Sequence, residues 1–402
     1  MDKKDIQNLG ERTKAVHAGE FPDPATNASA PNIVMSTTFV VDADTGFSVE
    51  GMDETDTWVY TRWGNPTIRQ LEEKLSALEG AETAVAFASG MGAITALLFH
   101  LLRAGDHAVV SDVAYAALSE ITNELIPELG VEITKVDTSD TAAVEAAIRA
   151  NTKLVYVETP CNPILRLTDI VAVATVAHRA GAKLAVDSTF ATPMATRPLL
   201  LGADFVIHSL TKYLCGHGDA LGGVLLGNAN DLALLRRQTA VRLGGTISPF
   251  NAWLIIRGLA TLPLRMRVHQ ENALKIASYL EQNSAIKRVI YPGLSSHPQH
   301  ELAKRQMNNF SGIITFQVND RRSVKKIAER LEIIHYAVSL GHHRSLIFYL
   351  DSGDLLKTSF KFATSRQYDS WNIFAGEGIF RFSAGLEDAE DLIADLEQAL
   401  DV

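Results

Sequence analysis

Short apolar runs alternate with longer helical patterns along the first half of this chain, and this alternation most constrains its fold. The apolar residues of the longer stretches recur every three or four positions, which is typical of helices that bury one face. Continuous apolar strands alternating with helices predict a mostly parallel sheet covered on both faces. We therefore expect an α/β fold with a seven-stranded sheet. The expected strands are 84–88, 108–111, 131–136, 154–158, 183–187, 205–209 and 223–226.

The length of 402 residues predicts more than one domain, because single domains usually span roughly 100–200 residues. Residues 1–60 contain Pro22, Pro24 and Pro31 and no regular pattern, so we expect an N-terminal arm there. A main α/β domain is expected over 61–258 and a smaller C-terminal α+β domain over 259–402. The expected C-terminal elements are strands 313–318 and 380–383 and helices 324–331 and 388–400.

Composition excludes several classes of protein. The net charge is -10 and no basic block is present, so nucleic acid and anionic membranes are not expected partners. The two cysteines, Cys161 and Cys215, cannot form a disulfide framework or a cysteine metal cluster. The first residues are polar, and no run approaches the roughly 18 apolar residues that span a bilayer. We therefore expect a cytoplasmic protein.

Polar residues follow four of the expected strands, where open parallel sheets bind ligands, and Glu158–Asn162 is one of these four groups. Ser89-Gly90-Met91-Gly92 joins a strand to a helix, and glycines at a helix start suit a phosphate. Asp187 ends another strand, where its carboxylate would hold a protonated ring nitrogen or cap a loop. Ser209 and Lys212 follow a third strand, and an amine flanked by hydroxyls suits imine chemistry next to a phosphate.

Two other motifs compete for these residues. Gly90-x-Gly92, with Asp112 after the next strand, is similar to a dinucleotide-binding fingerprint, but Thr95 replaces its third glycine. A plain tight turn is the other reading of this glycine pair. Ser209-x-x-Lys212 matches the penicillin-binding serine enzymes, yet the Ser-Asp-Asn and Lys-Thr-Gly motifs of those enzymes are missing from the sequence.

Six motifs occur in order along the chain: 60–67 (YTRWGNPT), 89–91 (SGM), 158–163 (ETPCNP), 187–190 (DSTF), 208–213 (HSLTKY) and 381–387 (RFSAGLE). Taken together they resemble the pyridoxal-phosphate-dependent (PLP-dependent) enzymes of cysteine and methionine metabolism, which include cystathionine γ-synthase, the cystathionine lyases, methionine γ-lyase and O-acetylhomoserine sulfhydrylase. The resemblance runs from about residue 12 to 400 and implies an aspartate-aminotransferase-like (type I PLP) fold and a homotetramer of two tight dimers.

This resemblance also implies a role for each matching residue. Lys212 would carry pyridoxal 5'-phosphate (PLP) as a Schiff base and move protons, and Asp187 would pair with the pyridine nitrogen. Tyr115 would stack on the ring and act as an acid or base. Arg381 would bind the substrate carboxylate through a bidentate pair. The further implied contacts are Ser89, Gly90, Met91, Ser209 and Thr211 at the phosphate, Asn162 at the ring hydroxyl, Ser339 and Tyr60 at the substrate, and Tyr60 and Arg62 reaching the phosphate from the neighbouring subunit.

The sequence departs from the family pattern at two places. Ala117 stands where methionine γ-lyases have a cysteine, which argues against methionine as the substrate. His342-His343-Arg344 begins an unusual loop, expected to run to Leu350 beside the substrate side chain, so specificity should be unusual too. The two histidines suggest a metal pair, but adjacent residues point apart on a strand, so we expect no metal.

Residues before Tyr60 suggest what the substrate carries. We hypothesise that Asp53, Glu54 and Asp56 line the entrance of the neighbouring subunit's site and favour a substrate with a cationic far end, such as cystathionine or canavanine. The alternative is a solvated acidic turn.

A PLP-dependent γ-lyase is the expected function, acting on a methionine-, cystathionine-, homoserine-ester- or canavanine-like amino acid. A γ-replacement enzyme is the alternative, since Ser248-Pro249-Phe250-Asn251-Ala252 resembles the corresponding sulfhydrylase segment. A nicotinamide-dependent dehydrogenase and a non-catalytic PLP-binding protein are the alternatives from other classes.

Overall fold

The computed structural model describes residues 6, 8–23, 25–46 and 57–401. The chain divides into two compact units. Unit 1 comprises Met1–Leu101 and Asp204–Pro263, and unit 2 comprises Leu102–Ala203 and Leu264–Val402. Each unit thus combines segments from distant parts of the sequence. The domain boundaries expected at 60/61 and 258/259 stay a prediction.

Unit 1 carries three strands in the order β1-β7-β6, and both pairings are antiparallel. Their apolar side chains are buried, which explains why each was recognisable as a short apolar run. The strands are β1 (Thr83–Phe87), β6 (Phe205–Ser209) and β7 (Gly223–Gly227). The helices are α2 (Glu11–His17), α3 (Pro66–Glu79), α4 (Gly90–Leu101), α10 (Ala229–Leu235) and α11 (Pro249–Ala260), with a π-helix over Arg236–Val241.

Unit 2 carries four parallel strands in the order β5-β4-β2-β3. They are β2 (His107–Ser111), β3 (Glu132–Val136), β4 (Thr152–Glu158) and β5 (Lys183–Asp187). Helices follow these strands, as the alternating pattern predicts: α5 (Ala116–Asn123), α6 (Leu125–Glu128), α7 (Thr141–Ala147), α8 (Ile170–Arg179) and α9 (Thr192–Ala195). The seven expected strands are therefore confirmed, three in unit 1 and four in unit 2.

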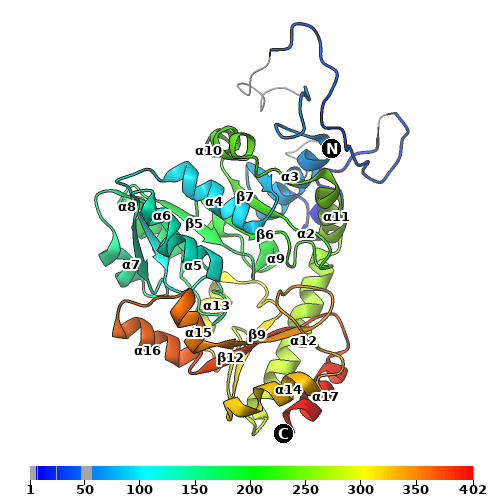
Figure 1. The fold of residues 1–402 in the computed structure, drawn as a ribbon. Coiled ribbons are helices and arrows are strands. Elements are labelled where there is room, and N and C mark those ends of the chain that lie inside the picture. Colours follow the sequence, from blue (N-terminus) through cyan, green and yellow to red (C-terminus); the bar gives the residue numbers. More distant parts are fainter. Residues whose placement is uncertain (1–5, 7, 24, 47–56, 402) are drawn as a thin grey trace. The chain divides into compact units, whose positions relative to one another are not determined.

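A second sheet in unit 2 has five strands in the order β10-β11-β12-β9-β8. Its core packs Phe316 and Phe380 against Ile327, Leu392 and the long helix α12 (Leu262–Gln282), and Figure 1 shows α12, α14 and α17 beside this sheet. The strands are β8 (Ile286–Ile290), β9 (Ile313–Val318), β10 (His335–Tyr336), β11 (Leu346–Asp351) and β12 (Gly378–Ser383). The helices are α13 (His300–Gln306), α14 (Val324–Arg330), α15 (Ser352–Thr358), α16 (Ser365–Phe374) and α17 (Ala389–Leu400).

The loop expected to start at His342 is shorter than the sequence suggested. Residues 342–344 form bends, but β11 begins at Leu346 and pairs with the whole of β12. The segment 346–350 is therefore a strand, and the expectation of a loop there is wrong. Among the described residues, no helix is both long and apolar enough to cross a membrane.

Candidate active site

The expected site residues fall into two groups, one in each unit. Unit 1 holds the glycine turn after β1, the segment after β6 that ends in Lys212, and Tyr60 with Arg62. Unit 2 holds Tyr115, Asn162, Asp187, Ser339 and Arg381.

The glycine turn after β1 leads directly into helix α4. Helix α4 begins at Gly90, and Ser89 Oγ accepts a hydrogen bond from Gly92 N at 3.0 Å. The N–H groups in the first turn of a helix have no partners within the helix, so they suit a phosphate. A Cβ atom added to Gly90 would lie 3.0 Å from Ser209 Cβ, and one added to Gly223 would lie 2.1 Å from Ser89 O. The turn therefore depends on glycine at both positions, and its residues fit a phosphate group.

Lys212 lies in a tight turn just after β6. Its N–H donates to Ser209 O at 3.3 Å, and Gly216 N donates to Lys212 O at 2.8 Å. Thr211 fixes the turn through its hydroxyl, which accepts from Gly222 N at 3.2 Å and donates to Gly222 O at 3.3 Å. Unit 1 thus holds Lys212 on the same strand end as Ser209, which packs against Gly90. A role of Thr211 at the phosphate stays a prediction.

Two carboxylates lie side by side in unit 2, because Asp187 at the end of β5 is the register partner of Glu158 at the end of β4. Both are buried. Asp187 accepts hydrogen bonds from the Tyr156 hydroxyl at 3.3 Å and from Thr189 N at 3.0 Å. Burial and the neighbouring Asp187 raise the pKa of Glu158 well above its ordinary value. A cation placed beside Asp187 would relieve the repulsion between the two carboxylates, so Asp187 fits a protonated ring nitrogen.

Glu158 lies in a strand-end segment that the sequence singled out, but the sequence did not reveal what its carboxylate contacts. Its two oxygens accept hydrogen bonds from Tyr115 N at 2.6 Å and from Asn162 N at 2.7 Å. The available signal was its place at the end of an apolar strand, directly before the segment that carries Asn162.

Arg381 is held in place by two oxygens. Its NH1 group donates to Asn162 Oδ1 at 2.9 Å, and its NH2 group donates to Ser339 O at 3.1 Å. Ser339 has a φ of 88°, which is uncommon for a residue other than glycine, and its hydroxyl lies 3.3 Å from His342 Nε2. Unit 2 thus brings Asn162, Ser339 and Arg381 together, and Glu158 joins Tyr115 to them. A guanidinium in this setting suits a carboxylate ligand.

Tyr60 and Arg62 contact each other within unit 1. The Arg62 guanidinium lies 5.4 Å from the centre of the Tyr60 ring and donates to Val241 O. Both side chains are exposed. Asp53, Glu54 and Asp56, which we expected near a substrate entrance, lie outside the described residues.

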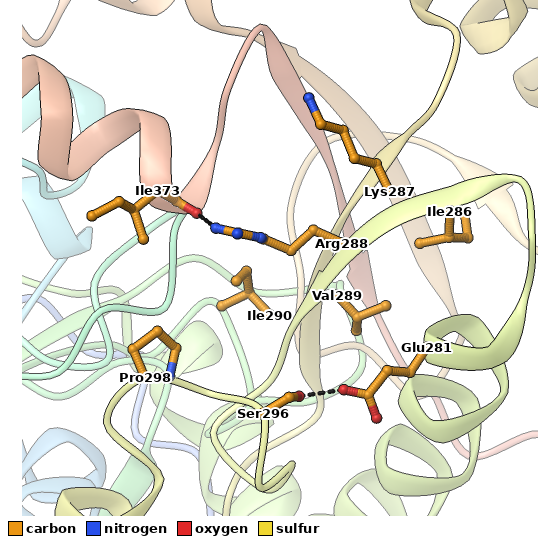
Figure 2. Close-up of a pocket in the computed structure, with 9 residues that line it drawn as sticks. All are labelled: Glu281, Ile286, Lys287, Arg288, Val289, Ile290, Ser296, Pro298 and Ile373. Carbon is orange, nitrogen blue, oxygen red and sulfur yellow. Dashed lines mark hydrogen bonds between the residues drawn. The ribbon is translucent and has the colours of Figure 1, made fainter.

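A pocket of about 390 Å³ opens in unit 2 beside β8 (Figure 2). Arg288 donates to Ile373 O across it, and Ser296 donates to Glu281. None of the expected site residues lines this pocket, and Lys287 and Arg288 in its wall are exposed. This pocket is therefore not the site that the sequence predicts.

This chain is similar to known proteins along nearly its whole length. The family described as Cys/Met metabolism PLP-dependent enzyme matches residues 12–401. A canavanine γ-lyase of Pseudomonas canavaninivorans is 42% identical, covering 100% of this chain and 98% of the relative. An L-methionine γ-lyase of Porphyromonas gingivalis is 41% identical, and the match covers 100% of this chain and 99% of the relative. The crystal structure of metB from Corynebacterium glutamicum matches with a TM-score of 0.90 and 39% identity, covering 100% and 99%.

Proposed function

The chain belongs to the PLP-dependent enzymes of cysteine and methionine metabolism, and on that premise we propose that it eliminates the γ-substituent of an L-amino acid. The cofactor is PLP, and the aspartate-aminotransferase-like fold expected from the sequence is confirmed. The observation that carries the proposal is the match along the whole chain to γ-lyases at 41% and 42% identity. A nicotinamide-dependent dehydrogenase has no support in this family.

The proposed roles follow from where each side chain lies in its unit. When bound, PLP supplies an electron sink for charge that develops on the substrate. Lys212 would hold the cofactor covalently, and its amine, once the amino group of the substrate has displaced it, would take the proton from the substrate Cα. Asp187 would keep the ring nitrogen charged, because a buried carboxylate stabilises a cation. Ser89, Gly90, Met91, Ser209 and Thr211 would hold the phosphate.

The second set of roles concerns the substrate. Arg381 would bind the α-carboxylate, with Ser339 beside it, and Asn162 would orient both Arg381 and the ring hydroxyl. Tyr115, whose side chain is 44% exposed, would stack on the ring and pass a proton to the leaving group.

The cofactor-binding lysine can be identified directly. Borohydride reduction of the PLP-loaded protein, followed by peptide mass spectrometry, should place a pyridoxyl group on Lys212. Lys212→Ala should lose the visible absorption of the bound cofactor and the activity. A pyridoxyl group on another lysine, with Lys212→Ala still active, would refute this assignment.

We propose further that the active unit is at least a dimer, and that the chain forms a homotetramer of two tight dimers. Support comes from large apolar side chains that unit 1 leaves exposed and that a subunit contact would cover. They include Met35 at 60%, Leu221 at 59% and Leu243 at 65% exposure. Tyr60 and Arg62 would then reach the phosphate of the neighbouring subunit.

Shared sites can be tested by mixing two inactive variants. Arg62→Ala and Lys212→Ala should each be inactive alone. A refolded mixture should regain activity, because a mixed dimer contains one site with both native residues. A mixture that stays inactive, although size analysis shows mixed dimers, would contradict the proposal.

A γ-replacement enzyme is the second candidate, and the resemblance of 248–252 to a sulfhydrylase favours it. In the structure, Ser248 caps α11 by accepting from Phe250 N at 3.2 Å, which gives this segment a structural task independent of the reaction. Elimination and replacement share their catalytic groups and differ in whether a second nucleophile is needed.

The experiment is a substrate panel without added thiol. Keto acid and homoserine would be assayed with L-methionine, L-cystathionine, O-acetyl-L-homoserine, L-homocysteine and L-canavanine. Product from one member establishes a lyase and identifies its leaving group. Turnover that begins only when sulfide or cysteine is added moves the enzyme to the replacement class. No turnover under either condition would favour a non-catalytic PLP-binding protein.

A further inference from the structure

A single buried carboxylate in unit 2 joins two loops of the site. Glu158 is 4% exposed and ends β4. One of its oxygens accepts from Tyr115 N at 2.6 Å and the other from Asn162 N at 2.7 Å. Tyr115 precedes α5, 43 positions earlier in the chain, so this contact joins segments that are distant in sequence. Hydrogen bonds from N–H groups to an ionised carboxylate are among the stronger ones in proteins.

The connection continues beyond Asn162. The side-chain oxygen of Asn162 accepts from Arg381 at 2.9 Å, and Arg381 donates to Ser339 O at 3.1 Å. The carboxylate of Glu158 therefore lies at the start of a chain of contacts that leads to the guanidinium. Burial and Asp187 raise the pKa of Glu158, while the two N–H donors and Arg381 oppose this shift. The two N–H donors and Arg381 thus favour the ionised form of Glu158, against burial and Asp187.

We propose that Glu158 is a positioning residue, which sets where Tyr115 and Asn162 stand and, through Asn162, where Arg381 points. This inference rests on the proposed function, because the roles of these three residues give Glu158 its consequence for the reaction. Glu158 itself contacts neither substrate nor cofactor in this account. Its effect is on alignment, and misplacement by about 1 Å can lower a rate about 100-fold.

Glu158→Gln is the informative variant, because it keeps the size of the side chain but replaces one acceptor oxygen by an amide donor. One of the two N–H groups would then face another donor and lose its partner. Asp395→Asn is the matched control. Asp395 is also 4% exposed in unit 2, and its oxygens accept from Glu332 N, Ile333 N and Ile334 N at 2.8–2.9 Å.

Three kinds of measurement would be made on both PLP-loaded variants: steady-state kinetics for kcat and KM, the visible circular dichroism of the bound cofactor, and the melting temperature. For Glu158→Gln we expect kcat/KM to fall about 100-fold, with a rise in KM because Arg381 shifts, and an altered cofactor dichroism. For Asp395→Asn we expect a lower melting temperature, an unchanged dichroism and kcat/KM within about twofold of the wild type. Wild-type dichroism and kinetics in Glu158→Gln, or equal losses in both variants, would overturn the proposal.

Hydrogen exchange of the wild-type protein keeps the proposal testable if Glu158→Gln does not fold. The amides of Tyr115 and Asn162 should exchange at least about 100-fold more slowly than unstructured amides, although both lie outside helices and strands. Near-intrinsic exchange at either amide would overturn the proposal.

Failure of the proposed function can be distinguished from failure of the proposed role of Glu158. The wild type would then release no product from any amino acid, whereas the dichroism of Glu158→Gln and the exchange of the two amides would still decide the role of Glu158.

Discussion

A buried histidine in unit 2 should make the protein less stable in mild acid. His297 is 3% exposed, and its Nδ1 accepts from Gln299 N at 3.0 Å. Its Nε2 lies 3.1 Å from Leu165 O and therefore donates to this carbonyl. These two contacts fix a neutral imidazole, because a proton on Nδ1 would remove the acceptor for Gln299. Burial lowers the pKa of His297 from 6.5 to about 4.

The sign of the effect follows from proton binding. In the unfolded chain this histidine binds a proton near pH 6.5, and in the folded protein only near pH 4. Its contribution to stability is therefore fully present above pH 6.5 and is lost as the pH falls through about 4. The two pKa values give a loss of about 2 kcal/mol between pH 7.5 and 5, and about 3 kcal/mol by pH 4.

The assay is urea unfolding of wild type and His297→Gln at pH 7.5 and pH 5.0. Glutamine retains one donor and one acceptor but does not titrate. Between pH 7.5 and pH 5.0 the wild type should therefore lose about 2 kcal/mol more of its free energy of unfolding than His297→Gln loses. His335→Gln, at an exposed position, is the control, and its free energy of unfolding should change with pH as that of the wild type does. An equal difference at both pH values would refute the reasoning.

Three further predictions concern other buried groups. Arg166 is 3% exposed and pairs with two aspartates. The substitution Arg166→Met should lower the free energy of unfolding by about 3–5 kcal/mol, because it leaves buried carboxylates without their cation. A loss below about 1 kcal/mol in urea unfolding would contradict this. Burial raises the pKa of the Cys161 thiol to about 12, so it should react with Ellman's reagent at pH 8 only after unfolding, and rapid reaction in the native protein would be the contrary result. Gly223→Ala should weaken PLP binding at least about tenfold in a cofactor titration, because the added Cβ would displace Ser89. Gly10→Ala, with nothing within 4 Å of the added Cβ, should bind PLP like the wild type, and equal weakening in both variants would refute the steric argument.

The strands that could be predicted from the sequence are those with apolar residues between polar ends. The expected bounds 183–187, 205–209 and 313–318 agree with β5, β6 and β9, because all three are mostly buried. The edge strand β8 was missed because the exposed charges of Lys287 and Arg288 interrupt its apolar pattern. β11 was missed because its last four residues are only partly buried and show no clear alternation.

The candidate site was predictable only in part. The rule that ligands bind at strand ends, together with the family resemblance, led to Lys212, Asp187 and the glycine turn. The same rule singled out the strand end at Glu158, but neither could reveal the role of Glu158, because a hydrogen bond from the backbone N–H of Tyr115 to its carboxylate leaves no periodic pattern. The contact of Arg381 with Asn162, across 219 positions, likewise required the fold.

The most direct test of γ-elimination is to measure both products of one reaction. PLP-loaded protein would be incubated with the best substrate of the panel and no added nucleophile. The released γ-substituent would then be quantified together with keto acid and homoserine. We predict one released γ-substituent for each keto acid or homoserine formed, at a rate that sulfide does not increase. Release of the γ-substituent only after sulfide or cysteine is added would contradict the account and identify a replacement enzyme.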